Sequence, residues 1–280
     1  MPGYFATNNF DTLAIGNGSM TKWTLLSLAV LLPTTAMAEV QTKTITYQDG
    51  ETTLKGVLAW DDAQTGKRPG ILVVHEWWGL NDYAQGRAKQ LAGLGYVAFA
   101  LDMYGDGKVT QHPQQAGECA GQIRANNEAW LARARAGLKV LTSQHQVDTA
   151  NLAAIGYCFG GSTALQLALA GEDLKAAVSF HGALPEPSEK QAAAVKASIL
   201  VCHGSADAFI PQEAIEKFEA PLNEAGADWQ LIEYGNARHS FTNPDADKVG
   251  IENLKYNAKA DRRSWQDMLN LFGEVFSGAK

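Results

Sequence analysis

The feature that most constrains the fold is the segment 155–162, with the sequence IGYCFGGS. An apolar run precedes it and an Ala- and Leu-rich stretch follows it, so the pattern predicts a strand, a sharp turn and a helix. Gly156 and Gly160 flank Cys158 at equal spacing. Such a turn strains the backbone of its central residue, and side chains at the two glycines would collide as strand and helix close on each other. The segment therefore predicts a cysteine nucleophile at a helix N-terminus.

An acid and a histidine follow Cys158 in the order that a catalytic triad requires. Asp207 lies in a loop just after the apolar strand predicted at 198–202. His239 lies in a loop after the strand predicted at Trp229 to Tyr234. The gap from Cys158 to Asp207 and the gap from Asp207 to His239 each leave room for strand and helix units. A buried structural cysteine in a glycine-rich turn is the competing interpretation.

At these residues the chain resembles the dienelactone hydrolases, the carboxymethylenebutenolidase-like family of α/β-hydrolases. The resemblance covers roughly residues 40–276, and the matching segments are HEWWG at 75–79, GYCFGG at 156–161, GSAD at 204–207 and HSF at 239–241. It implies an α/β-hydrolase fold, with a mostly parallel central sheet and helices on both faces. It also implies hydrolysis of a small-molecule ester or lactone without a cofactor.

The remaining pattern agrees with one domain of this class, at 39–280, because predicted strands and helices alternate. An Asp49-Gly50 hairpin signal joins the first two strands. We expect loops at 105–111 and 184–191, strands at 44–47, 52–60, 69–75, 96–101, 152–155, 176–180, 198–202 and 229–234, and helices at 82–94, 114–143 with a break near 126–127, 163–170, 211–225 and 258–276.

The segment 1–38 is expected to lie outside that domain. A basic start at Met20, an apolar stretch at 23–32 and a small-x-small site before Glu39 have the pattern of a secretory signal peptide, Met20–Ala38, behind an upstream extension. The apolar stretch is too short to span a bilayer, which takes roughly 20 residues. An apolar tail or membrane anchor is the alternative. Cleavage would leave a mature chain that begins at Glu39, secreted and expected in the periplasm.

Charge and cysteine content exclude several classes of function. The net charge of −7 with no basic run argues against nucleic acid and, after signal cleavage, against membranes. The three cysteines are an odd number, which leaves at least one free thiol, and we expect that thiol to be Cys158. The histidines are scattered, so no metal site is predicted. His75, His181 and His203 each follow an apolar strand and are expected to orient loops. The chain is expected to be a monomer or small homo-oligomer.

The residue chemistry assigns roles around the turn. A free thiol, with a pKa of about 8.5, is mostly protonated at neutral pH; the helix N-terminus and His239 would raise the thiolate fraction. Asp207 would hold the imidazole in one tautomer. The N–H of Phe159 should form one half of an oxyanion hole, and the N–H of Trp77, in the loop after the first long strand, the other.

Glu76 follows that strand directly and has two interpretations. It is either a solvated loop charge or N-cap partner or, as the resemblance implies, a carboxylate that contacts the resting thiol and yields it when substrate binds. A nearby carboxylate disfavours a thiolate, which would protect the thiol from oxidation. We therefore predict that Glu76 modulates the thiol.

The sequence departs from the family at two arginines that bind the substrate carboxylate. The first should follow the Asp-x-Tyr segment that ends at Tyr104, and the second should lie a few residues past His239, but neither is present. Arg238 or Lys108 could take their place. Aromatic residues suggest instead an apolar acyl pocket, formed by Trp78, Tyr104 and Phe209. Other acyl hydrolases or peptidases, a binding protein and a thiol sensor remain alternatives.

Overall fold

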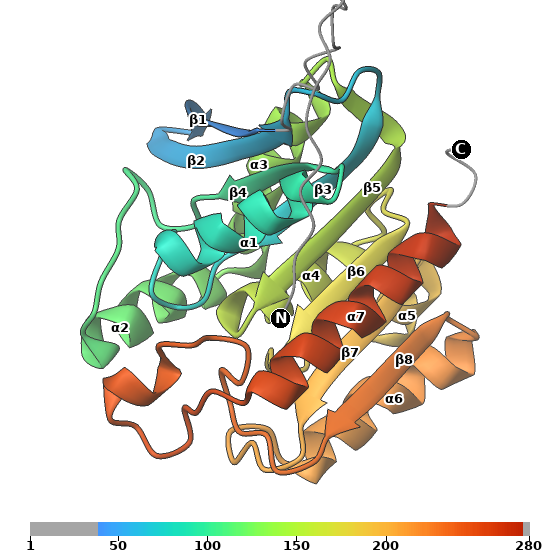
Figure 1. The fold of residues 1–280 in the computed structure, drawn as a ribbon. Helices are drawn as coiled ribbons and strands as arrows, with labels where there is room; N and C mark the ends of the chain where they lie inside the picture. Colours follow the sequence, from blue (N-terminus) through green and yellow to red (C-terminus); the bar gives the residue numbers. More distant parts are fainter. Residues whose placement is uncertain (1–38, 277–280) are drawn as a thin grey trace, which may run out of the picture. The chain divides into compact units, whose positions relative to one another are not determined.

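A computed structural model describes residues 39–276, so the predicted signal peptide and upstream extension lie outside the described residues. Within the described range the chain forms one sheet flanked by helices (Figure 1). None of the helices between residues 39 and 276 has the length and apolar character needed to cross a membrane.

The sheet has eight strands in the order β1-β2-β4-β3-β5-β6-β7-β8. The hairpin of β1 and β2, and the contact of β2 with β4, are antiparallel, and all other neighbours run parallel. The strands are β1 (Val40–Asp49), β2 (Thr52–Asp61), β3 (Arg68–Val74), β4 (Val97–Leu101), β5 (Val147–Tyr157), β6 (Ala176–Phe180), β7 (Ser198–Gly204) and β8 (Trp229–Tyr234).

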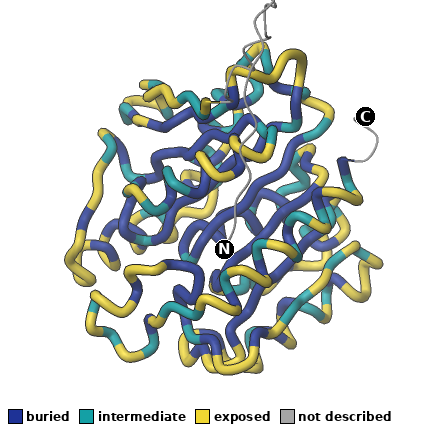
Figure 2. The backbone as a smooth tube through the Cα atoms, viewed as in Figure 1, coloured by how far each residue is buried: buried dark blue, intermediate teal, exposed yellow. Residues whose placement is uncertain are grey.

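Helices cover both faces of this sheet, as Figure 1 shows. One apolar core lies between the sheet and α1 and α7, and the other between the sheet and the helices α3, α4 and α6. Every residue of β4 and β6 is buried, as expected of parallel strands covered on both faces (Figure 2). The helices are α1 (Asp82–Gly93), α2 (Pro113–Arg124), α3 (Asn127–Thr142), α4 (Phe159–Leu169), α5 (Glu189–Ala194), α6 (Gln212–Ala225) and α7 (Ala258–Val275).

The predicted elements are present, but several are longer than predicted, since β1 begins at Val40, β5 runs from Val147 to Tyr157 and α4 begins at Phe159. The break between α2 and α3 falls at Asn126, which caps α3. The loop predicted at 184–191 is wrong in its last residues, because α5 begins at Glu189. Ser188 and Gln191 form a capping box that starts this helix. A 3-10 turn at Ala246–Val249 was also not predicted.

Parallel strands place their carboxyl ends at one edge of the sheet, where ligands bind in open α/β folds. Six consecutive segments leave the sheet at that edge, and they carry most of the predicted site residues. These residues are Glu76 after β3, Tyr104 after β4, Cys158 after β5, His181 after β6, Asp207 after β7 and His239 after β8.

The turn after β5 depends on contacts that only glycine permits. A Cβ added at Gly156 would lie 2.0 Å from the carbonyl oxygen of Gly160, and one at Gly160 would lie 2.2 Å from that of Val74. Helix α4 therefore starts in direct backbone contact with β5 and β3. This contact fixes where the N-terminus of α4 points.

We predict that Gly160→Ala lowers the free energy of unfolding by about 4 kcal/mol or more, because the collision involves backbone atoms that cannot move aside. Gly86→Ala, in α1, is the control, since an added Cβ there meets nothing within 4 Å. It should stabilise the protein by up to about 1 kcal/mol. Denaturant unfolding measures both, and equal effects would contradict the packing argument.

Candidate active site

Cys158 stands at the apex of the turn in a backbone conformation that side chains rarely adopt. Its backbone angles are φ 53 and ψ -113 degrees. Its N–H donates to the carbonyl of Phe180 at 2.9 Å and to Nδ1 of His181 at 3.1 Å. Phe159 is the first residue of α4, so its N–H has no acceptor within the helix. The half-buried thiol therefore lies beside a free helix N-terminus.

His239 and Asp207 form a buried pair. Nδ1 of His239 donates to Oδ2 of Asp207 at 2.7 Å. The other carboxylate oxygen accepts from the N–H of Phe209 at 2.9 Å and from Nδ2 of Asn253 at 3.0 Å. Burial would raise the pKa of Asp207, but the hydrogen bond and charge of His239, with these further bonds, hold it below its usual value. Asp207 thus stays ionised and fixes the imidazole.

The imidazole of His239 lies beside the turn at Cys158, because it packs edge-on against the ring of His181, with centroids 5.2 Å apart, and His181 bonds the N–H of Cys158. Burial would lower its pKa, but the charge of Cys158 and the hydrogen bonds to Asp207 and Cys158 outweigh burial and raise the pKa to about 10. The structure therefore brings together the three residues that the sequence predicted to act as nucleophile, base and acid.

The second predicted oxyanion donor lies in a peptide group held from several sides. The carbonyl of Glu76 and the N–H of Trp77 belong to the same planar peptide group. Contacts that orient the carbonyl therefore also orient the N–H. That carbonyl accepts from Nδ1 of His75 at 2.5 Å and from the N–H of Gly79 at 3.3 Å. The hydroxyl of Tyr104 donates to the carbonyl of Trp77 at 3.0 Å. These bonds hold the loop that carries the Trp77 N–H.

His75 is buried and orients the loop after β3, as predicted. It donates through Nδ1 to the carbonyl of Glu76 and accepts at Nε2 from the N–H of Met103 at 3.2 Å. Burial lowers the pKa of His75 to about 4, although the carbonyl of Glu76 and the charge of Asp102 oppose the fall. The ring is therefore neutral, with one nitrogen donating and the other accepting.

His181 orients the turn at Cys158 in the same way. Its Nδ1 accepts the N–H of Cys158, so the proton of the neutral ring lies on Nε2. Nε2 then donates to Oγ1 of Thr242 at 2.8 Å. Burial, with the nearby charge of His239, lowers the pKa of His181 well below its usual value. This ring is therefore neutral as well.

Glu76 is buried and bonded to the loop that follows His239. Its two carboxylate oxygens accept from Oγ of Ser240 at 2.7 Å and from Nδ2 of Asn243 at 2.6 Å. Burial raises the pKa of the carboxyl, although these two bonds oppose the rise. The solvated interpretation is wrong, since Glu76 has no exposed surface. Within the described part of the chain its side-chain hydrogen bonds go to this loop and not to Cys158, and its effect on the thiol stays a prediction.

The predicted pocket residues lie at different distances from the nucleophile. Phe209 is 55% exposed, and its ring packs edge-on against His239 with centroids 5.1 Å apart. The ring of Tyr104 lies 5.8 Å from that of Phe159. Trp78 packs edge-on against Trp77 but faces a separate cluster formed with Ala116, Ala246 and Leu254.

The two cations suggested for the missing arginines lie in other surroundings. Arg238 bonds the carbonyl of Glu252 at 2.7 Å and pairs with its carboxylate. Lys108 belongs to the loop after β4, where its N–H donates to the carbonyl of Gly105 at 3.0 Å. A different cation lies nearer the turn: Arg124, at the end of α2, is 5.3 Å over the ring of Phe159. Sequence reasoning did not identify it.

Sequence reasoning also missed three supporting residues. Ser240 and Asn243 could have been suspected because they follow His239 closely. Asn253 gives no such signal, since it lies in an irregular segment before α7. Among residues 39–276, no group of His, Cys, Asp or Glu could hold a metal ion.

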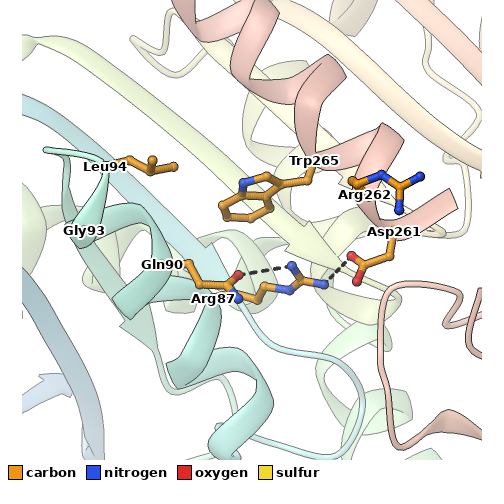
Figure 3. A pocket seen from close by; sticks show the side chains of 7 residues that line it. All are labelled: Arg87, Gln90, Gly93, Leu94, Asp261, Arg262 and Trp265. Carbon is orange, nitrogen blue, oxygen red and sulfur yellow. Dashed lines mark hydrogen bonds and ion pairs between the residues drawn. The ribbon is translucent and has the colours of Figure 1, made fainter. Parts of the chain in front are cut away.

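A separate pocket of about 460 Å³ lies between α1 and α7 and contains none of the predicted site residues (Figure 3). Its walls include Arg87, Asp261 and Trp265, and Arg87 pairs with Asp261 there. Arg87 also donates to the carbonyl of Thr242 at 2.7 Å, so one wall of this pocket supports the loop after His239.

The mostly parallel sheet, the helices on both faces and the turn at Cys158 define an α/β-hydrolase. The chain belongs to the dienelactone hydrolase family, whose model matches residues 54–276. A Yersinia pestis protein with the provisional name carboxymethylenebutenolidase is 32% identical over 247 residues, which are 80% of this chain and 87% of that protein.

Solved structures agree with this assignment. The structure named m3DLH is 44% identical, with a TM-score of 0.82, and the match covers 84% of this chain and 98% of that one. A dienelactone hydrolase-like promiscuous phosphotriesterase from metagenomic libraries is 40% identical, with a TM-score of 0.83 over 85% of this chain and 99% of that one. The chain is therefore a hydrolase of this family.

We predict that His239 titrates near pH 10 in the folded protein and that Asp207→Asn and Cys158→Ala each lower this value, because each removes a negative partner of the imidazolium. NMR titration of ring-labelled histidine measures it. The folded pKa lies above the unfolded value of about 6.5. The associated stability is therefore complete below the unfolded pKa and disappears as pH rises through about 10. An unchanged titration in both variants would contradict the assignment.

Proposed function

We propose that the protein hydrolyses a small ester or lactone through an acyl-thioenzyme, with Cys158 as nucleophile. The observation that carries this proposal is the position of His239, which bonds Asp207 and packs against His181, the residue that bonds the N–H of Cys158. Such an arrangement both activates a thiol and supplies a proton donor for the leaving group. No cofactor is required.

In the first half-reaction the thiolate of Cys158 attacks the carbonyl carbon and forms a C–S bond. The carbonyl oxygen gains negative charge, which the N–H groups of Phe159 and Trp77 stabilise. The tetrahedral intermediate collapses, the C–O bond to the alkoxy group breaks, and the imidazolium of His239 protonates the leaving oxygen. In a lactone this oxygen remains attached to the acyl chain.

In the second half-reaction water replaces the leaving group. His239, now neutral, takes a proton from water while the water oxygen attacks the thioester carbon. The C–S bond breaks, the acid leaves, and the proton on His239 returns the pair to its starting state. Asp207 remains ionised throughout and stabilises the imidazolium.

The walls around this centre favour an apolar acyl group. Phe209 and Tyr104 present aromatic surface near His239 and Phe159, and the positions of the family's carboxylate-binding arginines hold other residues. Aromatic surface gains free energy by burying apolar groups. We therefore infer a preference for apolar acyl groups.

A second candidate is hydrolysis of phosphotriesters. It is favoured by the 40% identity to a structure that is named a promiscuous phosphotriesterase. The same thiolate would attack phosphorus, form a P–S bond and expel the aryloxide, and water would then cleave the P–S bond. The N–H groups that stabilise an oxyanion would serve the phosphoryl oxygen.

A thiol sensor that pairs Cys158 with Cys202 has less support. Cys202 is fully buried in β7 and accepts a hydrogen bond from Tyr234 at 3.6 Å. Burial raises its pKa to about 12, which makes it a poor partner for thiol exchange. A binding protein without turnover would not need the bonds between Asp207, His239 and Cys158.

We also propose that residues 20–38 direct export and that the mature protein, beginning at Glu39, acts in the periplasm. The proposal rests on the basic, apolar and small-x-small pattern of that segment. We expect intact-mass analysis of the exported fraction to give a chain that starts at Glu39. A full-length chain recovered only from the cytoplasm would contradict export.

For the mechanism, we predict a burst of p-nitrophenol from short-chain p-nitrophenyl esters, loss of both burst and turnover in Cys158→Ala, and little change in Cys119→Ala. Cys119 is the matched control, since it is a free, buried cysteine in α2. A lactone panel and a p-nitrophenyl dialkyl phosphate run beside the esters. Wild-type turnover in Cys158→Ala would remove Cys158 as nucleophile, and turnover of the phosphate alone would favour the second candidate.

A further inference from the structure

The loop that carries His239 turns back immediately after the histidine in a strained conformation. Ser240 has a positive φ of 56 degrees. Residues other than glycine rarely occupy this left-handed region, and such a conformation persists only where surrounding contacts fix it. The backbone bond from the N–H of Asn243 to the carbonyl of Ser240, at 2.9 Å, closes the turn, and the side chains of Tyr83, Arg87 and His181 hold Thr242 within it.

Glu76 adds a buried contact from the end of β3. Its carboxylate receives the Ser240 hydroxyl and the Asn243 amide, one on each oxygen, and so holds the turn at both ends. The three side chains are buried, with Glu76 0% exposed and Ser240 2% exposed. The two bonds join Glu76 to residues that lie 164 and 167 positions further along the chain, so they connect the end of β3 to the loop after β8. Buried bonds to a charged acceptor are among the stronger ones in proteins.

We propose that Glu76 is a positioning residue that holds the His239 loop in its active conformation through Ser240 and Asn243. This inference deepens the proposed function and rests on it. The loop has other supports, since Arg87 bonds the carbonyl of Thr242 and the N–H of Lys255 bonds the carbonyl of His239 at 3.0 Å. Loss of Glu76 therefore displaces the imidazole without unfolding the loop.

Two substitutions at Glu76 separate hydrogen bonding from charge. Glu76→Gln removes the charge but can keep both bonds. The new amide oxygen accepts from Asn243, and the new amide nitrogen donates to the hydroxyl of Ser240, which then acts as acceptor instead of donor. Glu76→Ala removes both bonds and leaves two buried polar groups without partners. Ser240→Ala removes one bond alone and serves if Glu76→Ala does not fold.

We expect Glu76→Gln to keep kcat within about threefold of wild type and Glu76→Ala to lower kcat by roughly 10- to 100-fold with KM little changed, as for residues that orient a catalytic group. Ser240→Ala should fall between them. The double variant Glu76→Ala/Ser240→Ala should be no slower than Glu76→Ala, since both act through one contact. Leu222→Ala, on the buried face of α6, is the control for lost stability, and it should lower the melting temperature without this loss of kcat.

The histidine titration and the alkylation rate of Cys158 by iodoacetamide give readouts that need no turnover. Glu76→Ala should lower the pKa of His239 by at least about one pH unit, since the imidazole moves away from its partners, and Glu76→Gln should lower it less, since only the charge of Glu76 is lost. If the two variants change the alkylation rate and kcat equally while the pKa of His239 stays at its wild-type value, the proposal is overturned. Direct action of Glu76 on the Cys158 thiol is then favoured. Absence of ester turnover in wild type would count against the proposed function, while the titration would still decide the role of Glu76.

Discussion

The close backbone contact of α4 with β5 and β3 is the constraint on which the site depends. Only glycine at 156 and 160 permits it, since an added Cβ would lie 2.0 Å and 2.2 Å from carbonyl oxygens. The contact forces Cys158 to positive φ and directs the N-terminus of α4 at the edge of the sheet where the other loops meet. A thiol on a flexible loop would have neither the helix N-terminus nor a fixed distance to His239.

Neutral buried histidines then organise the surrounding loops. His75 fixes the peptide that carries the Trp77 N–H, and His181 fixes the N–H of Cys158. Because burial keeps both rings uncharged, each can donate at one nitrogen and accept at the other. His181, whose ring packs against that of His239, therefore carries no charge that competes with the positively charged imidazole for Asp207.

Much of this arrangement could be predicted from the sequence because its signals are local. The glycine spacing around Cys158, the apolar strands and the order of Asp207 and His239 all follow from short patterns. The start of α5 was missed because Pro185 and Pro187 suggested a loop, although the capping box of Ser188 and Gln191 was visible in the sequence. That error does not affect the site.

Contacts between distant segments could not be predicted in the same way. Asn253 bonds Asp207 across 46 positions from a segment without periodic pattern. The family resemblance directed Glu76 toward the thiol, whereas its hydrogen bonds go to Ser240 and Asn243. The direction of a buried side chain depends on the packing of several loops at once, and no local pattern encodes it. Such contacts distinguish members of one family that share the same motifs.

The central claim is that substrate carbon becomes bonded to the sulfur of Cys158. Rapid acid quench of the protein during turnover of p-nitrophenyl acetate, followed by peptide mapping, tests it directly. We predict an added acetyl group on the peptide that contains Cys158, cleaved by neutral hydroxylamine as thioesters are. Acetyl groups on other residues, or none during measurable turnover, would contradict it.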